Sequence, residues 1–397
     1  MRLVIILASF FIVLQAKDVH PPIGDFTPKC LAGNGSLYDP AKSSEVPWLT
    51  VDLDLPYEQR YANVVKPFAD DMKKVIAIVK EMAQIFLGNN SISAIDALMQ
   101  HAFDELFPPS YREEIRGISN ATGIPTHDLA LMNIFYELSR FCTSIIAQTY
   151  NGQLFHARNL DFGQLFIWDN STRSWALTDS LKKVTVNIKF VKNNTVLFMG
   201  TTFAGHTGII TGMKPNMFTI SMDAKALLPD TQQLMKWFSG GYNGSDLHFA
   251  MWAEREIMEK CNSFQEAQDY LSSITQLAGC YYILGGANPG EGIIIVRNAT
   301  DVTATVQLNP DEENGWYILQ TNYDPDQLPM YLDDRRDPGN NCMRQLGRGN
   351  VSAAGIYEVL ASKTTLNKTT VHTVIMSLAT GLYQTFIAYC PDPCWPF

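Results

Sequence analysis

Two β-forming runs joined by Asn151-Gly152 constrain this chain more than any other feature of its sequence. The runs cover residues 142–150 and 153–161. Asn-Gly between such runs is typical of a two-residue type I′ turn, because both central residues of that turn need a positive φ. The turn predicts a hairpin in which Cys142 lies opposite Asp161, with Arg158 three residues back along the same strand. A bulge shifts such a pairing by a residue or two, yet the hairpin still gathers a thiol, a guanidinium and a carboxylate.

These three groups suit nucleophilic catalysis. The thiolate is the nucleophilic form of cysteine, and a neighbouring cation stabilises it. Arg158 stays charged at any working pH, and Asp161 can orient either Arg158 or an amine at the nucleophile by hydrogen bonding. The plainer alternative is a buried strand cysteine beside an ordinary ion pair, and composition alone favours that alternative.

Other kinds of chemistry find no support in the sequence. The cysteine motif of papain-like proteases is absent, as are the Gly-x-Ser-x-Gly elbow and the Gly-x-x-x-x-Gly-Lys phosphate loop. The seven histidines show no metal-binding spacing, so we expect neither a metal nor a cofactor. The formal charge of −10 argues against a nucleic-acid partner.

The first sixteen residues have the pattern of a secretory signal peptide. Met1-Arg2 supplies the positive end, residues 3–14 are an apolar stretch, and Ala16 suits the last position before cleavage. Secretion agrees with nine Asn-x-Ser/Thr triplets, whose asparagines are candidate glycosylation sites at the surface. They are Asn34, Asn89, Asn120, Asn170, Asn193, Asn243, Asn298, Asn350 and Asn367. Secretion also lets cysteines pair, and the odd count of seven leaves at least one thiol outside the pairs.

The sequence pattern is helical before about residue 141. Apolar residues recur at three- and four-residue spacing through residues 68–86, and Gly88 predicts the end of this helix. Ser110, three residues before Glu113, has the capping-box pattern that opens a helix. Thr126 predicts the cap of a third helix, which runs to about residue 138.

After residue 141 the pattern is mostly β. Residues 184–190 alternate between apolar and polar side chains, as in a half-buried strand. Asn193-Asn194 predicts a turn into the next strand. Further strands are expected at residues 196–199, 281–284, 293–296, 316–321 and 371–376. Ser263 and Glu266 form a second capping box, so helices are interleaved with the strands. Antiparallel hairpins together with separate helices predict an α+β fold.

At these residues the sequence resembles the N-terminal nucleophile hydrolases, and among them the acid ceramidase family. The matching stretches run in the family's order over nearly the whole chain. They are residues 133–138, 142–145, 158–163, 321–324, 332–336 and 390–394. The resemblance implies a signal peptide of residues 1–16, a mostly helical α chain of residues 17–141 and a catalytic β chain of residues 142–397 with an αββα sandwich.

The resemblance also implies that the precursor cuts its own Phe141–Cys142 bond. The freed Cys142 then carries a thiol and a new α-amine, which serves as the general base in place of a histidine. Arg158 and Asp161 hold the nucleophile end of the site, and Asn322 and Arg335 complete it. We expect Asn322 to donate to the tetrahedral oxyanion, and Arg335 to add charge and hold the geometry.

The implied reaction is ceramide hydrolysis. Cys142 attacks the amide carbonyl, sphingosine leaves as the amine, and water hydrolyses the thioester to release the fatty acid. The resemblance places this reaction in the lysosome, with secretion also open. Ceramide would be met at a lipid surface, with a saposin-type activator as a further partner.

The family implies two disulfides. They are Cys30–Cys342 and Cys390–Cys394. The first would tie the α and β chains into a disulfide-linked heterodimer, and the second would close a small loop near the C-terminus. Cys261 and Cys280 match no family position. They either pair with each other or remain buried thiols.

At one position the chain departs from the family. The family's acidic residue corresponds here to Ala224, with Asp223 beside it. Neighbouring strand residues point to opposite faces, so Asp223 is not expected to replace that acid. Two alternatives to ceramide hydrolysis therefore stay open. One is an N-acylethanolamine-hydrolysing acid amidase, and the other is a catalytically impaired lipid-binding glycoprotein of the same fold.

Overall fold

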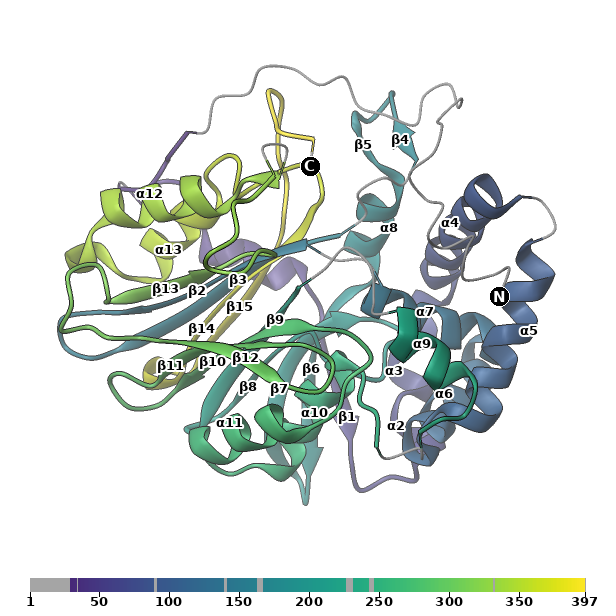
Figure 1. Ribbon diagram of the computed structural model, residues 1–397. Helices are drawn as coiled ribbons and strands as arrows, with labels where there is room; N and C mark the ends of the chain where they lie inside the picture. Colours follow the sequence, from purple (N-terminus) through teal and green to yellow (C-terminus); the bar gives the residue numbers. More distant parts are fainter. Residues whose placement is uncertain are drawn as a thin grey trace.

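The computed structural model describes residues 29–33, 35–88, 91–138, 141–162, 167–225, 231–242, 246–330 and 333–396. The expected signal peptide, residues 1–16, lies outside these ranges, as do Asn34, Asn89 and Asn243. Within them, two β-sheets face each other and are flanked by helices, with a helical region at one side (Figure 1).

The larger sheet combines strands predicted after residue 184 with one strand from the N-terminal region. In spatial order it consists of β1 (Trp48–Asp52), β6 (Thr185–Lys192), β7 (Thr195–Phe203), β8 (Thr211–Lys214), β9 (Phe218–Ala224), β10 (Cys280–Gly286), β11 (Gly292–Arg297) and β12 (Val302–Gln307). β1 pairs with β6 in parallel, and the other neighbours are antiparallel. The predicted turn forms between β6 and β7, where Asn193 and Asn194 have φ of 50° and 59°.

The smaller sheet carries the hairpin that contains Cys142. In spatial order it consists of β13 (Tyr317–Gln320), β2 (Phe141–Gln148), β3 (Leu154–Asp161), β14 (Thr370–Ser377) and β15 (Leu382–Ile387). All its neighbouring strands are antiparallel. Apolar side chains such as Ile146, Tyr281 and Ile283 fill the space between the two sheets. A short separate hairpin consists of β4 (Trp168–Asp169) and β5 (Ser174–Trp175).

Helices cover the outer face of each sheet (Figure 1). On the larger sheet lie α10 (Ala250–Lys260) and α11 (Phe264–Ser273), and on the smaller sheet lie α12 (Arg336–Leu346) and α13 (Ala353–Leu360). Met343 and Ile356 of the latter pair belong to one core cluster with Ile145 and Ile375 of the smaller sheet. The layers therefore follow the order helix, sheet, sheet, helix, which confirms the expected αββα sandwich.

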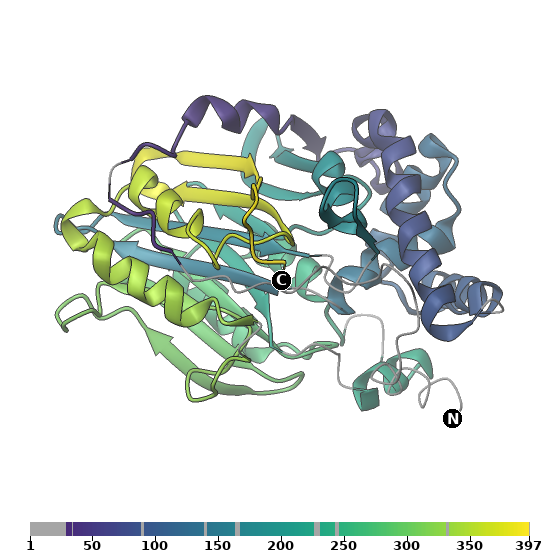
Figure 2. The ribbon, with the colours of Figure 1, turned by 90° about the horizontal axis from the view of Figure 1, so that it is seen from above.

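The N-terminal region is mostly helical, as expected, and lies beside the sandwich (Figure 2). Its elements are α2 (Tyr57–Arg60), α3 (Ala62–Val65), η2 (Lys66–Phe68), α4 (Ala69–Leu87), α5 (Ser91–His101), η3 (Ala102–Leu106), α6 (Pro109–Thr122) and α7 (Thr126–Leu138). The preceding η1 (Pro40–Glu45) instead packs against β15 of the smaller sheet. Later in the chain come α8 (Ala176–Val184), which contacts α4, and α9 (Thr231–Phe238), η5 (Arg348–Asn350) and η6 (Leu378–Thr380). The sequence did not reveal that this region also contributes β1 to the larger sheet.

In the part of the chain that the structure describes, no helix has both the length and the apolar character needed to cross a membrane.

The predicted helix ends are confirmed in part. α4 ends with Gly88 at φ 87°, and Ser263 caps α11 by accepting from the third residue along (3.1 Å). The capping box at Ser110 is wrong, because α6 already begins at Pro109 and has no side-chain cap. Proline suits the first position of a helix because its φ is already helical, so the helix starts before Ser110 and not after it. Thr126 begins α7, but its hydroxyl bonds to a side chain of α5 (3.1 Å).

The close packing of α2 against α6 depends on Gly117. A Cβ built at Gly117 would lie 1.9 Å from the backbone oxygen of Glu58. Alanine in place of glycine normally stabilises a helix interior by about 1 kcal/mol. Here we expect Gly117→Ala to destabilise the fold by about 1–3 kcal/mol, because the two backbones must separate. Urea denaturation measures this, with the exposed Arg116→Ala as control, and an unchanged or higher stability of Gly117→Ala would contradict the packing.

Candidate active site

β2 and β3 form the predicted hairpin, but the predicted register is wrong by one residue. Cys142 lies opposite Leu160, and Asp161 lies opposite Phe141. Side chains alternate between the two faces of a strand, and residues directly opposite each other share a face. A shift of one residue therefore changes which residues of β3 share a face with Cys142. Arg158 therefore shares a face with Cys142, whereas Asp161 does not.

The turn explains this shift. Gly152 has a φ of 87°, whereas Asn151 does not adopt positive φ. The N–H of Thr149 donates to the oxygen of Gln153 (3.0 Å), and the N–H of Gly152 donates to the oxygen of Thr149 (3.2 Å). This is a three-residue loop with a left-handed glycine at its end, another common hairpin connection. It has one residue more than the two-residue turn that Asn-Gly predicts.

Cys142 is fully buried near the start of β2, and Arg158 contacts its sulfur. Nη2 of Arg158 donates to Sγ of Cys142. Nη1 donates to the carbonyl oxygen of Ile210 (2.8 Å) and to the hydroxyl of Thr211 (3.3 Å). These partners fix the orientation of the buried guanidinium. A fixed cation at a thiol favours the thiolate, which is the nucleophilic form.

Arg335, directly before α12, joins the backbone of Cys142 to two carboxylates. Its Nη1 donates to the carbonyl oxygen of Cys142 (2.6 Å) and to Oδ2 of Asp161 (3.1 Å). Its Nε and Nη2 lie 3.0 Å and 2.9 Å from Oδ1 of Asp333. Burial alone would lower the pKa of Arg335, but Asp333 and Asp161 outweigh it and raise that pKa. Arg335 is therefore a permanent buried cation that fixes the Cys142 carbonyl.

Asn322, in the loop after β13, holds the backbone nitrogen of Cys142. Its Oδ1 accepts from that N–H (2.9 Å) and from Nη2 of Arg335 (2.7 Å), and two donors at one atom identify it as the oxygen. Its Nδ2 donates to the carbonyl of Ala224 (2.8 Å). This bond uses one of the two hydrogens on Nδ2 and leaves the other for a further acceptor. Asn322 positions the nitrogen of Cys142, and its expected donation to the oxyanion stays a prediction.

Asp161 acts in this arrangement through Arg335. The two residues form a buried ion pair. Burial raises the pKa of Asp161, although the charge of Arg335 opposes this. The carboxylate thus helps to hold the guanidinium that binds the Cys142 carbonyl.

Asp223 brings a further carboxyl group to the site, contrary to expectation. Its Oδ1 accepts from the hydroxyl of Ser144 (2.8 Å) and lies 3.9 Å from Nη2 of Arg158. The side chain is fully buried. Burial raises the pKa of Asp223 to about 7, against the opposing effects of Arg158 and Ser144. The position next to Ala224 therefore supplies an acid that the family places elsewhere.

The sequence carried a signal for Asp223 that we did not use. Polar side chains occupy every second position of β9, whereas the intervening Ile220 and Met222 belong to the apolar core. The polar series is Thr219, Ser221 and Asp223. Alternation of this kind marks one face of a strand. Asp333 and Ser144 were also missed as site residues, although both lie in stretches that resemble the family, residues 332–336 and 142–145.

The two disulfides that the resemblance implies are present in the structure. Cys30 is bonded to Cys342, and Cys390 to Cys394. Cys261 and Cys280, whose state the sequence left open, are separate buried thiols, as is Cys142. The seven cysteines therefore form two disulfides and leave three thiols, of which Cys142 is one.

The candidate glycosylation sites differ in exposure. Exposed sites are Asn120, Asn170, Asn193, Asn298 and Asn350. Asn367 is only 1 % exposed, and its Oδ1 accepts from the N–H (2.8 Å) and hydroxyl (2.5 Å) of Thr369. A glycan needs an asparagine at the surface, so the prediction for Asn367 is wrong.

Among the described residues, one cluster has the side chains of a metal site. It consists of Asp96, His127 and Asp128. The ammonium of Lys80 pairs with both carboxylates and lies 2.8 Å from Asp96. A lysine thus already supplies the positive charge, and the cluster is an ion-pair network that joins α4, α5 and α7.

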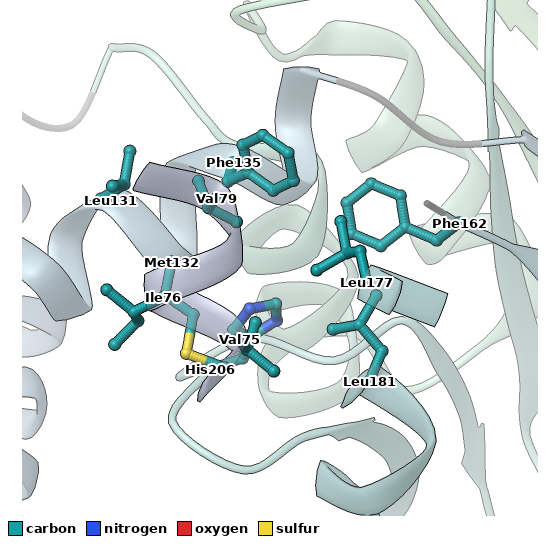
Figure 3. A pocket seen from close by; sticks show the side chains of 10 residues that line it. All are labelled: Val75, Ile76, Val79, Leu131, Met132, Phe135, Phe162, Leu177, Leu181 and His206. Carbon is teal, nitrogen blue, oxygen red and sulfur yellow. The ribbon is translucent and has the colours of Figure 1, made fainter. Parts of the chain in front are cut away.

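An apolar pocket with an empty volume of about 300 Å³ lies where the N-terminal helices meet the sandwich (Figure 3). It is lined by Val75, Ile76 and Val79 of α4, Leu131, Met132 and Phe135 of α7, Leu177 and Leu181 of α8, and Phe162 and His206. Phe162 directly follows Asp161 at the end of β3. Burial lowers the pKa of His206 to about 3, so the lining is uncharged.

Two family models match the chain on either side of Cys142. The beta subunit of N-acylethanolamine-hydrolyzing acid amidase matches residues 44–106. The linear amide C-N hydrolases of the choloylglycine hydrolase family match residues 142–312. The second match begins at Cys142 itself.

Similar proteins cover nearly the whole chain. A probable acid ceramidase of Caenorhabditis elegans is 49% identical over 96% of this chain and 95% of its own length. The acid ceramidase of Bos taurus is 35% identical over 99% of this chain and 98% of its own. Among solved structures, a Caenorhabditis elegans ortholog of N-acylethanolamine-hydrolyzing acid amidase is 28% identical, with a TM-score of 0.52. It covers 62% of this chain and 100% of that one.

Proposed function

Because this chain belongs to the acid ceramidase family of linear amide carbon–nitrogen hydrolases, we propose that it hydrolyses ceramide to sphingosine and a fatty acid through a thioester on Cys142. The observation that carries this proposal is the set of contacts around Cys142. Arg158 contacts the sulfur, Asn322 holds the nitrogen and Arg335 holds the carbonyl oxygen. The sulfur, the nitrogen and the carbonyl oxygen of Cys142 are thus each held by a buried side chain.

Cleavage of the precursor before Cys142 would come first. Sγ attacks the Phe141 carbonyl, the acyl group passes from nitrogen to sulfur, and water hydrolyses the resulting thioester. This step leaves a carboxylate on Phe141 and a free α-amine on Cys142. The α chain of residues 17–141 and the β chain of residues 142–397 would stay joined by Cys30–Cys342 and by the pairing of β1 with β6.

The freed amine then supplies the base for hydrolysis of the substrate. It takes the proton of the Cys142 thiol and later gives it to the departing amine of sphingosine. Oδ1 of Asn322, which accepts from the backbone N–H (2.9 Å), would orient this amine beside the sulfur. A thioester with the fatty acid remains, and water hydrolyses it.

A lipid acyl chain suits the apolar pocket. Its lining is apolar, as hydrocarbon requires, but the space enclosed in this structure holds only about one water, so an acyl chain would have to widen it. Residues of both proposed chains line it, so cleavage would leave the pocket at their boundary. We place the enzyme in the lysosome, acting on ceramide at a lipid surface with a saposin-type activator.

Hydrolysis of N-acylethanolamines is the second candidate function. It is favoured by the family match at residues 44–106 and by the likeness to the solved amidase ortholog. Both substrates present an amide to the same nucleophile and differ in the leaving amine.

Rates on ceramide and on palmitoylethanolamide, measured side by side with the purified protein, test the choice. We expect the higher kcat/KM on ceramide, and a strong preference for the ethanolamide would reject it. Cys261→Ala, which removes another buried thiol, should keep the same preference.

A further inference from the structure

A row of hydrogen-bonded side chains runs between the two sheets, from the nucleophile to a second cavity. The hydroxyl of Ser144 donates to Asp223 (2.8 Å) and accepts from that of Ser221 (2.9 Å). Ser221 lies 2.9 Å from Nε2 of His156, and Nδ1 of His156 lies 2.9 Å from the hydroxyl of Thr219. All five side chains are buried. His156 and Thr219 line a cavity with an empty volume of about 190 Å³.

This row can pair Asp223 in either protonation state. When the carboxyl is ionised, every hydrogen points toward it, from Thr219 through His156, Ser221 and Ser144. When the carboxyl is protonated, every bond reverses, and Thr219 donates to a backbone carbonyl of β10, 3.3 Å away. Each member both donates and accepts, so the reversal leaves none of them unpaired. His156 stays neutral throughout, because burial lowers its pKa to about 3.

One proton can therefore reach Asp223 along the row without a change in the charge of any other member. It enters at the hydroxyl of Thr219 on the cavity side. Each member passes its own hydrogen to the next, and Ser144 passes the last one to Asp223. The sequence of transfers moves one proton and leaves the reversed set of bonds.

The opposite side of Asp223 faces the cation at the nucleophile. Its Oδ1 lies 3.9 Å from Nη2 of Arg158, the same nitrogen that donates to Sγ of Cys142. An ionised Asp223 shares this cation with the thiolate, and two anions at one cation oppose each other's ionisation. A protonated Asp223 leaves the charge of Arg158 to the sulfur.

We propose, on the basis of the function proposed above, that Asp223 is a positioning residue for Arg158. When Asp223 is protonated, the charge of Arg158 acts on the Cys142 thiolate alone and stabilises it. The nucleophile is then most readily ionised while Asp223 is neutral. Neutralisation is supported by burial, which raises the pKa of Asp223 to about 7. It is also supported by Oδ2 of Asp223, which has no hydrogen-bond partner among the described residues.

The groups around Asp223 come from several elements. The described titratable or charged side chains that face it or act on its charge are Cys142, His156, Arg158, Asp161, Tyr281 and Arg335. Tyr281 donates to Asp324 (3.0 Å), and burial raises its pKa. Arg335 keeps its charge at any working pH. Next to Arg158, Asp223 is thus the carboxyl group whose pKa burial raises to about 7, and it can change the charge that Cys142 meets.

Alkylation of Cys142 by iodoacetamide tests this proposal. The folded wild type and Asp223→Asn are alkylated over a range of pH. The rate of modification at Cys142 is then read from the peptide that contains this residue. Asparagine mimics the protonated carboxyl at every pH. We expect similar rates on the acidic side of pH 7 and a half-maximal pH about one unit lower in the variant, because a neighbouring like charge is gone. An unchanged half-maximal pH in a folded Asp223→Asn overturns the proposal.

Two further variants make opposite predictions. Ser144→Ala removes a donor to the carboxylate, so Asp223 stays neutral to higher pH and the half-maximal pH of alkylation falls. Ser221→Ala removes the acceptor that Ser144 needs only when Asp223 carries the proton, so the half-maximal pH rises. Shifts of equal sign, or none, contradict the proposal.

Alkylation reports the ionisation of Cys142 and not the choice of substrate. A wild type that fails to hydrolyse ceramide but shows the expected alkylation shifts would therefore reject the proposed function alone. A wild type that hydrolyses ceramide without those shifts would reject the role of Asp223 alone.

Discussion

Cys142→Ala is expected to abolish amide hydrolysis and to leave the chain uncut. In the proposed mechanism the same sulfur attacks the Phe141 carbonyl in the precursor and the substrate amide afterwards, so one substitution would remove both reactions. Removing the nucleophile of a hydrolase typically costs at least about 10⁴-fold in rate. Amide hydrolysis and a reducing gel after acid incubation measure the two effects, with two bands expected for the wild type and one for the variant.

The chain offers a matched control for this substitution. Cys261 is also a buried thiol, and none of the contacts around Cys142 involves it. Cys261→Ala should give two bands and retain most of the activity. Two bands from Cys142→Ala would contradict our assignment of the nucleophile. A wild type that neither cleaves itself nor hydrolyses amides would instead support the catalytically impaired lipid-binding glycoprotein.

Glu114→Ala is expected to cause the largest loss of stability. Glu114 of α6 is fully buried, and its two oxygens accept from Nη1 and Nη2 of Arg255 in α10 (2.5 and 2.7 Å). Arg60 of α2 adds a third contact (3.1 Å). Removing the carboxylate leaves the buried guanidinium with the partly exposed Glu259 as its remaining counter-charge (2.7 Å), so we expect a cost at the lower end of about 3–5 kcal/mol. Urea denaturation of the two proteins at one pH gives the difference.

The neighbouring residue provides the control for that measurement. Glu113 pairs with Arg116 at the surface, where the two side chains are 34% and 46% exposed. An exposed pair contributes little, so Glu113→Ala should change the free energy of unfolding by less than about 1 kcal/mol. If Glu114→Ala were equally mild, the buried network would not hold the helical region against the sandwich.

Local sequence predicted the hairpin and the partners of its thiol only in outline. The two β runs, the Asn-Gly turn and the proximity of Cys142 to Arg158 all lie within residues 142–161. The exact pairing failed because Asn-Gly is compatible with loops of two and of three residues, and only the surrounding sheet selects one. The resemblance to a family, not local pattern, supplied Asn322, Arg335 and the disulfide partners.

The sequence by itself determined which residue is the nucleophile candidate and that its compartment allows disulfides, because those signals are contiguous or lie in residue identity. Only the tertiary structure decided which atoms of distant residues contact that candidate. Asn322 reaches Cys142 across 180 residues of sequence, and Asp223 reaches Ser144 across 79. The first contact forms because β13 pairs with β2 in one sheet, and the second forms only when the two sheets stack, since stacking decides which alternating face of β9 meets which face of β2. The acid absent at Ala224 is therefore supplied one residue earlier, by the face that points into the sandwich.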